Sequence, residues 1–217
     1  GQAQGIEGLL EDYAGVAEGL FALYAATGNP RWHHAAQELA AAAVERFLGP
    51  DGLSDTAREP EQIRQAQGGH SAANPLDDAV PSGTALLAGV LLTSASYGGP
   101  GRHRALAEGL VDHVRRAGPA IPQAVGWSMA VQQFLLDGPR ELAVTGTDRT
   151  AVARLLSAGR SAGGPGLVIA HGEAGGVGLL EGRETEAPAL AYVCRGMVCR
   201  RPVDSAPELE AELAGGN

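Results

Sequence analysis

Apolar residues recur at helical spacing through the first 136 residues of this 217-residue chain. In one segment the apolar side chains fall on a single face of a helix; they are Trp32, Ala35, Ala36, Leu39, Ala43 and Phe47. The same spacing recurs in other segments. The pattern predicts helices over residues 8–27, 31–47, 82–97, 101–117 and 121–136.

An internal repeat organises these helices. The segment GNPRWHHA at 28–35 recurs seventy positions later as GGPGRHRA at 98–105. In both copies an apolar helical run stops at a glycine, and a new helix starts at a proline, whose fixed φ suits the first turn. Each copy therefore predicts an αα-hairpin, and five such helices predict a helical array or toroid.

The pattern changes at Pro139 from helical periodicity to short apolar runs. Runs at 140–146 and 166–172 enclose a helical segment at 148–158, which predicts a β-α-β unit with parallel strands. A third strand is expected at 190–194 and a last helix at 205–213. The sequence thus predicts a mainly α protein with two regions: αα-hairpins over 1–138, and a small α/β appendage over 139–217.

Composition narrows the range of partners. A formal net charge of −9 argues against nucleic acid, which requires a clustered basic surface. The longest apolar stretch, 84–92, is too short to cross a bilayer, and no signal peptide precedes it. Two cysteines do not form the framework of a secreted scaffold, so we expect a cytoplasmic protein. The glycines at 172–178 follow a strand without opening a helix, so no nucleotide or other cofactor is expected.

Four sets of residues carry a resemblance to a known family. They are Leu10-Glu11-Asp12-Tyr13-Ala14, then Asp77-Asp78-Ala79-Val80-Pro81-Ser82-Gly83, then Gly138-Pro139-Arg140-Glu141, and finally Ala191-Tyr192-Val193-Cys194 with Cys199. Together they resemble the thioredoxin-domain-containing family that includes the spermatogenesis-associated thioredoxin-like proteins. The resemblance covers nearly the whole chain. It implies the C-terminal part of a protein with a thioredoxin-like domain followed by an (α/α) six-hairpin toroid, similar to glycosidases and N-acylglucosamine epimerases.

The chain also departs from that family's pattern. Asp78 stands where the family usually has asparagine or glycine, and Thr84-Ala85 replace an expected Asn-Ser. The loop at 63–74 lacks an expected Arg-Pro-Lys. If this loop lines the mouth of the toroid, ligand binding is altered or lost.

Candidate catalytic residues lie where inner helices begin. Sugar-processing toroids use paired carboxylates as general acid and as base or nucleophile, and Asp12, Asp77 and Asp78 are the candidates. Tyr13 and Ser82 would hydrogen-bond a sugar hydroxyl. The alternative interpretation is helix capping, because acids and serine at a helix start satisfy free N–H groups.

Epimerase chemistry would instead use paired histidines. The candidates on second helices of the hairpins, which we expect at the surface, are His33, His34, His103 and His113. Trp127 is expected to pack in the core, although an aromatic ring there could stack on a sugar.

Cys194 and Cys199 allow three interpretations. They could form a redox pair or disulfide across the four intervening residues, two ligands of a zinc site, or buried inert thiols beside a strand. The zinc interpretation lacks two further ligands with suitable spacing.

The function expected from these residues and the resemblance is that of a carbohydrate-enzyme-like toroid portion, with sugar hydrolysis or epimerisation at the helix starts. The alternative is a non-catalytic interaction or scaffold module serving a thioredoxin-like domain. The expected partners are a small sugar, and either the missing N-terminal thioredoxin-like and toroid portion or a second copy. An incomplete toroid would leave apolar faces of inner helices open.

Overall fold

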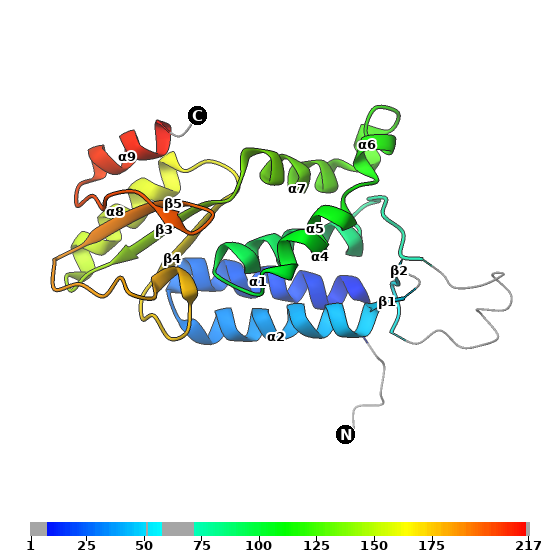
Figure 1. Cartoon of the computed structure of the whole chain (residues 1–217), viewed down its shortest axis with the longest axis horizontal. Coiled ribbons are helices and arrows are strands. Elements are labelled where there is room, and N and C mark those ends of the chain that lie inside the picture. Colours follow the sequence, from blue (N-terminus) through cyan, green and yellow to red (C-terminus); the bar gives the residue numbers. More distant parts are fainter. Residues whose placement is uncertain (1–7, 51, 58–71, 216–217) are drawn as a thin grey trace, which may run out of the picture. The chain divides into compact units, whose positions relative to one another are not determined.

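The protein is described from a computed structural model, which covers residues 8–50, 52–57 and 72–215. The chain is mainly α-helical and carries small sheets (Figure 1). It divides into two compact units. Unit 1 takes its described residues from Gly1–Leu20, Ala35–Leu92 and Arg102–Gln133; unit 2 takes them from Phe21–His34, Thr93–Gly101 and Phe134–Asn217. Among the described residues, no helix has the length and apolar character to cross a membrane.

The helices follow the periodicity of the sequence closely. The helices up to Asp137 are α1 (Leu10–Thr27), α2 (Pro30–Phe47), α4 (Gly83–Ser96), α5 (Arg102–Leu110), α6 (Val114–Ala117) and α7 (Gly126–Asp137), with a 3-10 turn at Pro122–Ala124. Helices α1, α2, α4 and α7 each contribute residues to both units.

Helices α1 and α2 lie antiparallel and are joined by a short connection (Figure 1). The Tyr13 ring meets Phe47 edge-on at 5.3 Å between ring centroids, and Phe21 meets His33 at 6.0 Å. The repeat is visible in the backbone, because Gly28 after α1 and Gly98 after α4 have φ values of 68° and 89°. A left-handed residue that ends a helix is favoured to be glycine, so the repeated glycine has a conformational cause.

The predicted helix at 101–117 is broken into α5 and α6. Residues 111–113 form a turn, and Nδ1 of His113 lies 3.0 Å from the backbone oxygen of Leu110. This side chain competes for a carbonyl near the helix end, which accounts locally for the interruption.

A small pair of strands that the sequence pattern did not predict follows α2. Strands β1 (Leu48–Gly49) and β2 (Gly52–Leu53) pair antiparallel. Two residues per strand are too few to show an alternation of apolar and polar side chains, so periodicity gives no signal for them.

Unit 2 contains a four-stranded sheet in the order β4-β3-β5-β6. The strands are β3 (Arg140–Thr145), β4 (Leu167–His171), β5 (Leu190–Arg195) and β6 (Val198–Cys199). Strands β3 and β4 are parallel and enclose α8 (Arg149–Ala162), which confirms the predicted β-α-β unit. Strand β5 pairs antiparallel with β3 and with β6, so the edge is a β-hairpin.

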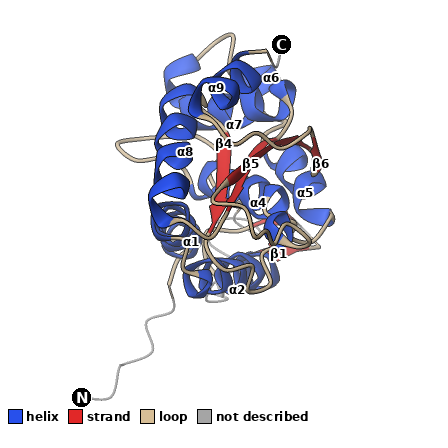
Figure 2. Cartoon of the chain, turned by 90° about the vertical axis from the view of Figure 1, so that its left-hand side faces the viewer, coloured by secondary structure: helices blue, strands red, loops and turns tan. Residues whose placement is uncertain are grey.

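Helix α8 and the last helix, α9 (Ala206–Ala214), pack on one face of this sheet (Figure 2). Leu142 of β3, Leu155 of α8 and Leu209 of α9 belong to the same buried cluster. Gly159 lets α8 approach the sheet, since a Cβ atom there would lie 2.3 Å from Cδ2 of Leu142. The other face carries the side chains that are discussed below.

An aromatic cluster in unit 2 surrounds His33, which is 4% exposed. The rings of Phe21, Tyr24 and Tyr97 lie 5.4 to 6.0 Å from the imidazole. Tyr24 and Tyr97 donate their hydroxyls to the backbone oxygens of His171 and Ile169 on β4, at 3.4 and 3.0 Å. The expectation of a surface position is therefore wrong for His33, because aromatic side chains of α1 and the ring of Tyr97, just after α4, cover it.

Candidate functional site

Ser82 is the N-cap residue of α4. Its Oγ accepts a hydrogen bond from the backbone N–H of Ala85 at 3.2 Å and donates one to the carbonyl oxygen of Pro75 at 3.3 Å. The side chain is buried, at 8% exposure. Capping, one of the two interpretations of this residue, is confirmed by these contacts.

Asp77 connects the starts of two helices. Its Oδ1 accepts from the backbone N–H of Ser82 at 3.0 Å, next to α4, and its Oδ2 accepts from the N–H of Trp127 at 2.9 Å, in the first turn of α7. Helix N-termini present unpaired N–H groups and a positive dipole end, which a carboxylate satisfies. Both carboxylate oxygens are thus engaged by the backbone.

Asp12 and Tyr13 lie in the first turn of α1. Oδ2 of Asp12 accepts from the backbone N–H of Leu9 at 2.8 Å, which is the reciprocal bond of a capping box. The Tyr13 ring packs against Phe47, and the guanidinium carbon of Arg46 lies 5.7 Å from the ring centroid. Both side chains have structural contacts on their own helix pair.

The starts of α1 and α4 are close to each other. A Cβ atom on Gly83 would lie 3.1 Å from Cγ of Leu10 and 3.2 Å from the backbone nitrogen of Glu11, so this approach favours glycine. Asp78 is exposed, and its carboxylate has no hydrogen bond or ion pair with another described residue. Of the predicted carboxylates, Asp12 and Asp77 act as caps, and Asp78 is the one whose side chain faces solvent.

Two of the candidate histidines, His33 and His103, are buried. Burial, and to a smaller extent His34, lowers the pKa of His33 to about 4. Burial and then Arg102 lower the pKa of His103, which is 1% exposed rather than at the surface as expected. Within the described part of the chain, no three His, Cys, Asp or Glu side chains are grouped to hold a metal ion.

Trp127 is 41% exposed. The expectation that its side chain packs in the core is therefore wrong. Its backbone N–H, rather than its indole ring, makes the contact with Asp77.

The two cysteines form a disulfide across the β5–β6 hairpin. Cys194 and Cys199 are directly opposite partners in the register, and the next pair is joined by a bond from the N–H of Arg200 to the oxygen of Val193 at 2.9 Å. This excludes free thiols and zinc ligation in this state and leaves the disulfide among the three interpretations. The disulfide atoms are unequally exposed, because Cys194 is 1% exposed and Cys199 is partly exposed.

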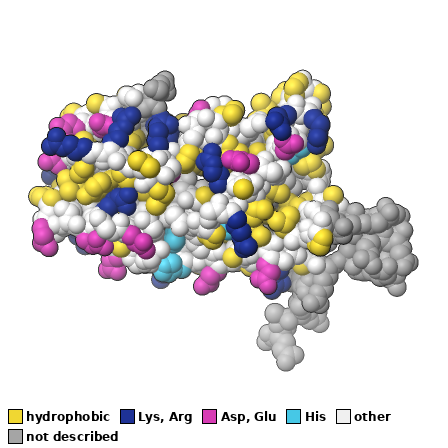
Figure 3. All heavy atoms as spheres, viewed as in Figure 1, with side chains coloured by type: hydrophobic (Ala, Val, Ile, Leu, Met, Phe, Trp, Pro, Cys, Tyr) yellow, Lys and Arg dark blue, Asp and Glu magenta, His cyan; other side chains and the backbone are white. Residues whose placement is uncertain are grey.

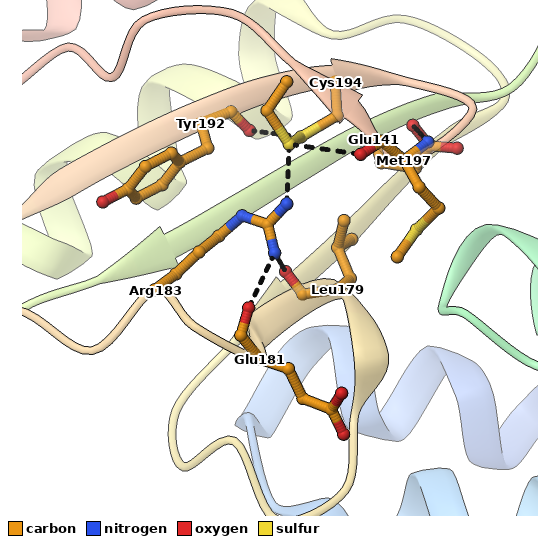
Figure 4. Close-up of a disulfide and its surroundings, with 8 residues drawn as sticks. Glu141, Leu179, Glu181, Arg183, Tyr192, Cys194 and Met197 are labelled. Atoms are coloured by element: carbon orange, nitrogen blue, oxygen red, sulfur yellow. Dashed lines mark hydrogen bonds between the residues drawn. A yellow bond between two sulfur atoms is a disulfide. The ribbon is translucent and has the colours of Figure 1, made fainter.

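Arg183 is a residue that sequence reasoning missed. Its Nη2 lies 2.8 Å from Sγ of Cys199, while Nη1 donates to the backbone oxygens of Leu179 and Glu181 at 2.8 and 3.2 Å (Figure 4). Its guanidinium carbon lies 5.7 Å from the centroid of the Tyr192 ring. Arg183 and Cys199 are sixteen positions apart in the sequence, so no local motif indicates this contact.

A buried carboxylate, that of Glu141, also lies beside the disulfide. Glu141 of β3 is directly opposite Cys194 in the sheet register, and Cys194 is directly opposite Cys199, so the three side chains share one sheet face. Glu141 is fully buried, and its Oε2 accepts from the N–H of Met197 at 3.4 Å (Figure 4). The turn of the hairpin is thus tied to β3.

The chain has no match in two comparisons with known proteins. No protein-family model matches the chain. No curated protein sequence matches it either.

Proposed function

We propose that this chain is the C-terminal, toroid-related part of a thioredoxin-domain-containing protein and acts as a non-catalytic interaction module. The observation that carries the proposal is the engagement of the candidate catalytic groups. Both oxygens of Asp77 and one oxygen of Asp12 accept backbone N–H groups at helix starts, and Ser82 caps α4. A general acid or base must reach a substrate proton, which these bonded oxygens are poorly placed to do.

Exposed apolar side chains support an interaction role. Three apolar side chains seven residues apart are exposed: Leu9, just before α1, is 40% exposed, and Val16 and Leu23 of α1 are 55% and 44% exposed. Seven-residue spacing places side chains near one stripe of a helix, which another helix could cover. Apolar side chains are also visible between charged ones on the face seen in Figure 3. In the proposed function, the α1 stripe packs against a second copy of the chain.

Sedimentation velocity of the wild-type chain and a Val16→Glu variant tests the proposal. The wild type should self-associate as its concentration rises, and Val16→Glu should weaken this, because a charge would be buried in the contact. Val80→Glu is the matched control, since Val80 is also exposed, at 62%, but lies outside α1. A wild type that stays monomeric at all concentrations, or equal association of both variants, would contradict the proposal.

Sugar hydrolysis or epimerisation is the second candidate. One observation favours it: α1 and α4 start side by side, and Asp77 joins the start of α4 to that of α7, with Asp78 exposed next to it. Sugar turnover that is lost in Asp78→Asn at unchanged stability would support this candidate. Asp77→Asn would lower stability by about 0.5–2 kcal/mol under either view, so it serves as the stability reference.

A further inference from the structure

We propose that Cys194 and Cys199 form a thiol–disulfide exchange site, with Cys199 as the nucleophile, Cys194 as the resolving cysteine and Arg183 as the positioning cation. This inference is independent of the proposed interaction role. It rests on the contacts of unit 2 alone.

Arg183 places a positive charge beside the sulfur of Cys199. Arg183 lies with Nη2 2.8 Å from Sγ of Cys199, and its other nitrogen is fixed by the carbonyls of Leu179 and Glu181. No carboxylate of the described residues lies within ion-pair distance of this guanidinium. When the disulfide is reduced, the positive charge therefore faces sulfur, and a neighbouring cation stabilises a thiolate relative to a thiol.

The two cysteines differ in their access to solvent. Cys194 is 1% exposed, whereas Cys199 lies on the edge strand β6 and is partly exposed. A sulfur atom from solution would therefore meet Cys199 first.

The disulfide contributes little to the stability of the hairpin. It joins residues only five positions apart, and the stabilisation from loop closure grows with loop length. The hairpin turn is already specified by Gly196 and Met197, whose φ values of 57° and 68° are those of a two-residue hairpin turn. The bond from Met197 N–H to Glu141 holds this turn independently.

The reaction balances as a two-electron exchange. The Cys199 thiolate attacks one sulfur of a substrate disulfide, a Cys199–substrate S–S bond forms, and one substrate thiolate leaves with the electron pair and takes a proton from water. Cys194 then loses its proton to solvent and attacks Sγ of Cys199, which forms the Cys194–Cys199 disulfide and releases the second substrate thiolate. The protein pair is oxidised, and the substrate is reduced to two thiols; two substrate thiols running the steps backward restore the protein.

The nucleophile is tested with oxidised glutathione as a small disulfide probe. Reduced Cys194→Ser should accumulate one glutathione per chain at Cys199, as seen by intact mass and peptide mapping, whereas reduced Cys199→Ser should react about tenfold more slowly or less. The reduced wild type should release two glutathione thiols per chain and recover its disulfide. Faster reaction at Cys194 than at Cys199 would overturn the assignment.

The role of Arg183 is tested by the pH dependence of Cys199 alkylation with iodoacetamide in the Cys194→Ser background. The midpoint should lie below about 8.5, the ordinary thiol pKa, and Arg183→Gln should raise it by about one pH unit. Arg183→Lys keeps the charge and should retain part of the effect, which separates charge from a loss of folding that circular dichroism would reveal. Identical profiles in all three proteins would contradict the positioning role.

Discussion

The helix starts of unit 1 and the edge hairpin of unit 2 are both rich in polar groups, yet these groups have different partners. At the helix starts, Asp77 and Asp12 accept hydrogen bonds from backbone N–H groups. At the hairpin, the charge of Arg183 faces the sulfur of Cys199. Carboxylates near helix N-termini are hydrogen-bonded by the backbone N–H groups of the helices. A guanidinium that is held by carbonyl oxygens is not neutralised, so its positive charge can act on a neighbouring group.

The difference has a physical origin in the kind of partner. A helix start supplies N–H donors and a positive dipole end, so an acid placed there is stabilised without any ligand. Carbonyl groups bind a guanidinium through their dipoles but do not neutralise its charge, unlike a carboxylate. Reactivity is therefore expected at the hairpin, and stability effects are expected at the helix starts.

The largest expected effect comes from Asp77→Ala. Removing this side chain leaves the N–H groups of Ser82 and Trp127, at the starts of α4 and α7, without their acceptor, so the free energy of unfolding should fall by about 2–4 kcal/mol. Asp78→Ala is the matched control and should change it by less than about 0.5 kcal/mol, because its side chain is exposed. Urea denaturation measures both values. A similar loss in the two variants would show that Asp77 is not the cap of both helices.

The second-largest expected effect is a pH dependence of stability in unit 2, because the pKa of His33 is strongly lowered. Its pKa is about 4 in the folded chain and 6.5 in the reference state, so the unfolded chain binds more protons between these values. Stability from this residue is complete above pH 6.5 and falls as the pH drops towards 4, by about 1–3 kcal/mol.

Denaturation of His33→Gln between pH 4 and 7.5 measures this contribution. The pH dependence should be flatter in His33→Gln than in the wild type. The variant His34→Gln should change the slope much less than His33→Gln, because burial is the larger cause of the lowered pKa of His33 and His34 is the smaller. Parallel curves for the wild type and His33→Gln would contradict the assignment.

The smallest expected effect is that of Asp12→Ala. This residue satisfies one exposed N–H group, that of Leu9, so its loss should cost about 0.5–1 kcal/mol. Asp12→Asn retains an acceptor oxygen and should recover part of this value. A loss as large as that of Asp77→Ala would mean that the number of helix starts served by each carboxylate does not determine its contribution.

The sequence predicts elements better than it predicts contacts. The apolar pattern predicts α1, α2, α4 and the β-α-β unit to within a few residues. Helix α2 buries one face, whereas α4 is a nearly continuous apolar run that is buried on most sides. The break at 111–113 depends on one side chain, His113, and the pair β1–β2 is too short to show a period.

In the candidate site, local contacts can also be predicted from the sequence, whereas contacts between distant residues cannot. Caps are local, so Ser82 and Asp12 can be interpreted from spacing alone. The second partner of Asp77 lies fifty positions away, at Trp127, and the burial of His33 depends on rings from another helix. Arg183 reaches Cys199 through tertiary structure, which no motif in a single sequence encodes.

The most direct test of the account is a redox titration of the Cys194–Cys199 disulfide in glutathione buffers, for the wild type and for Arg183→Gln. Because Arg183 stabilises the reduced thiolate, the wild type should become reduced at a less reducing buffer ratio, with midpoints about tenfold apart. Coincident midpoints would contradict the claim that the charge of Arg183 serves the chemistry of this hairpin.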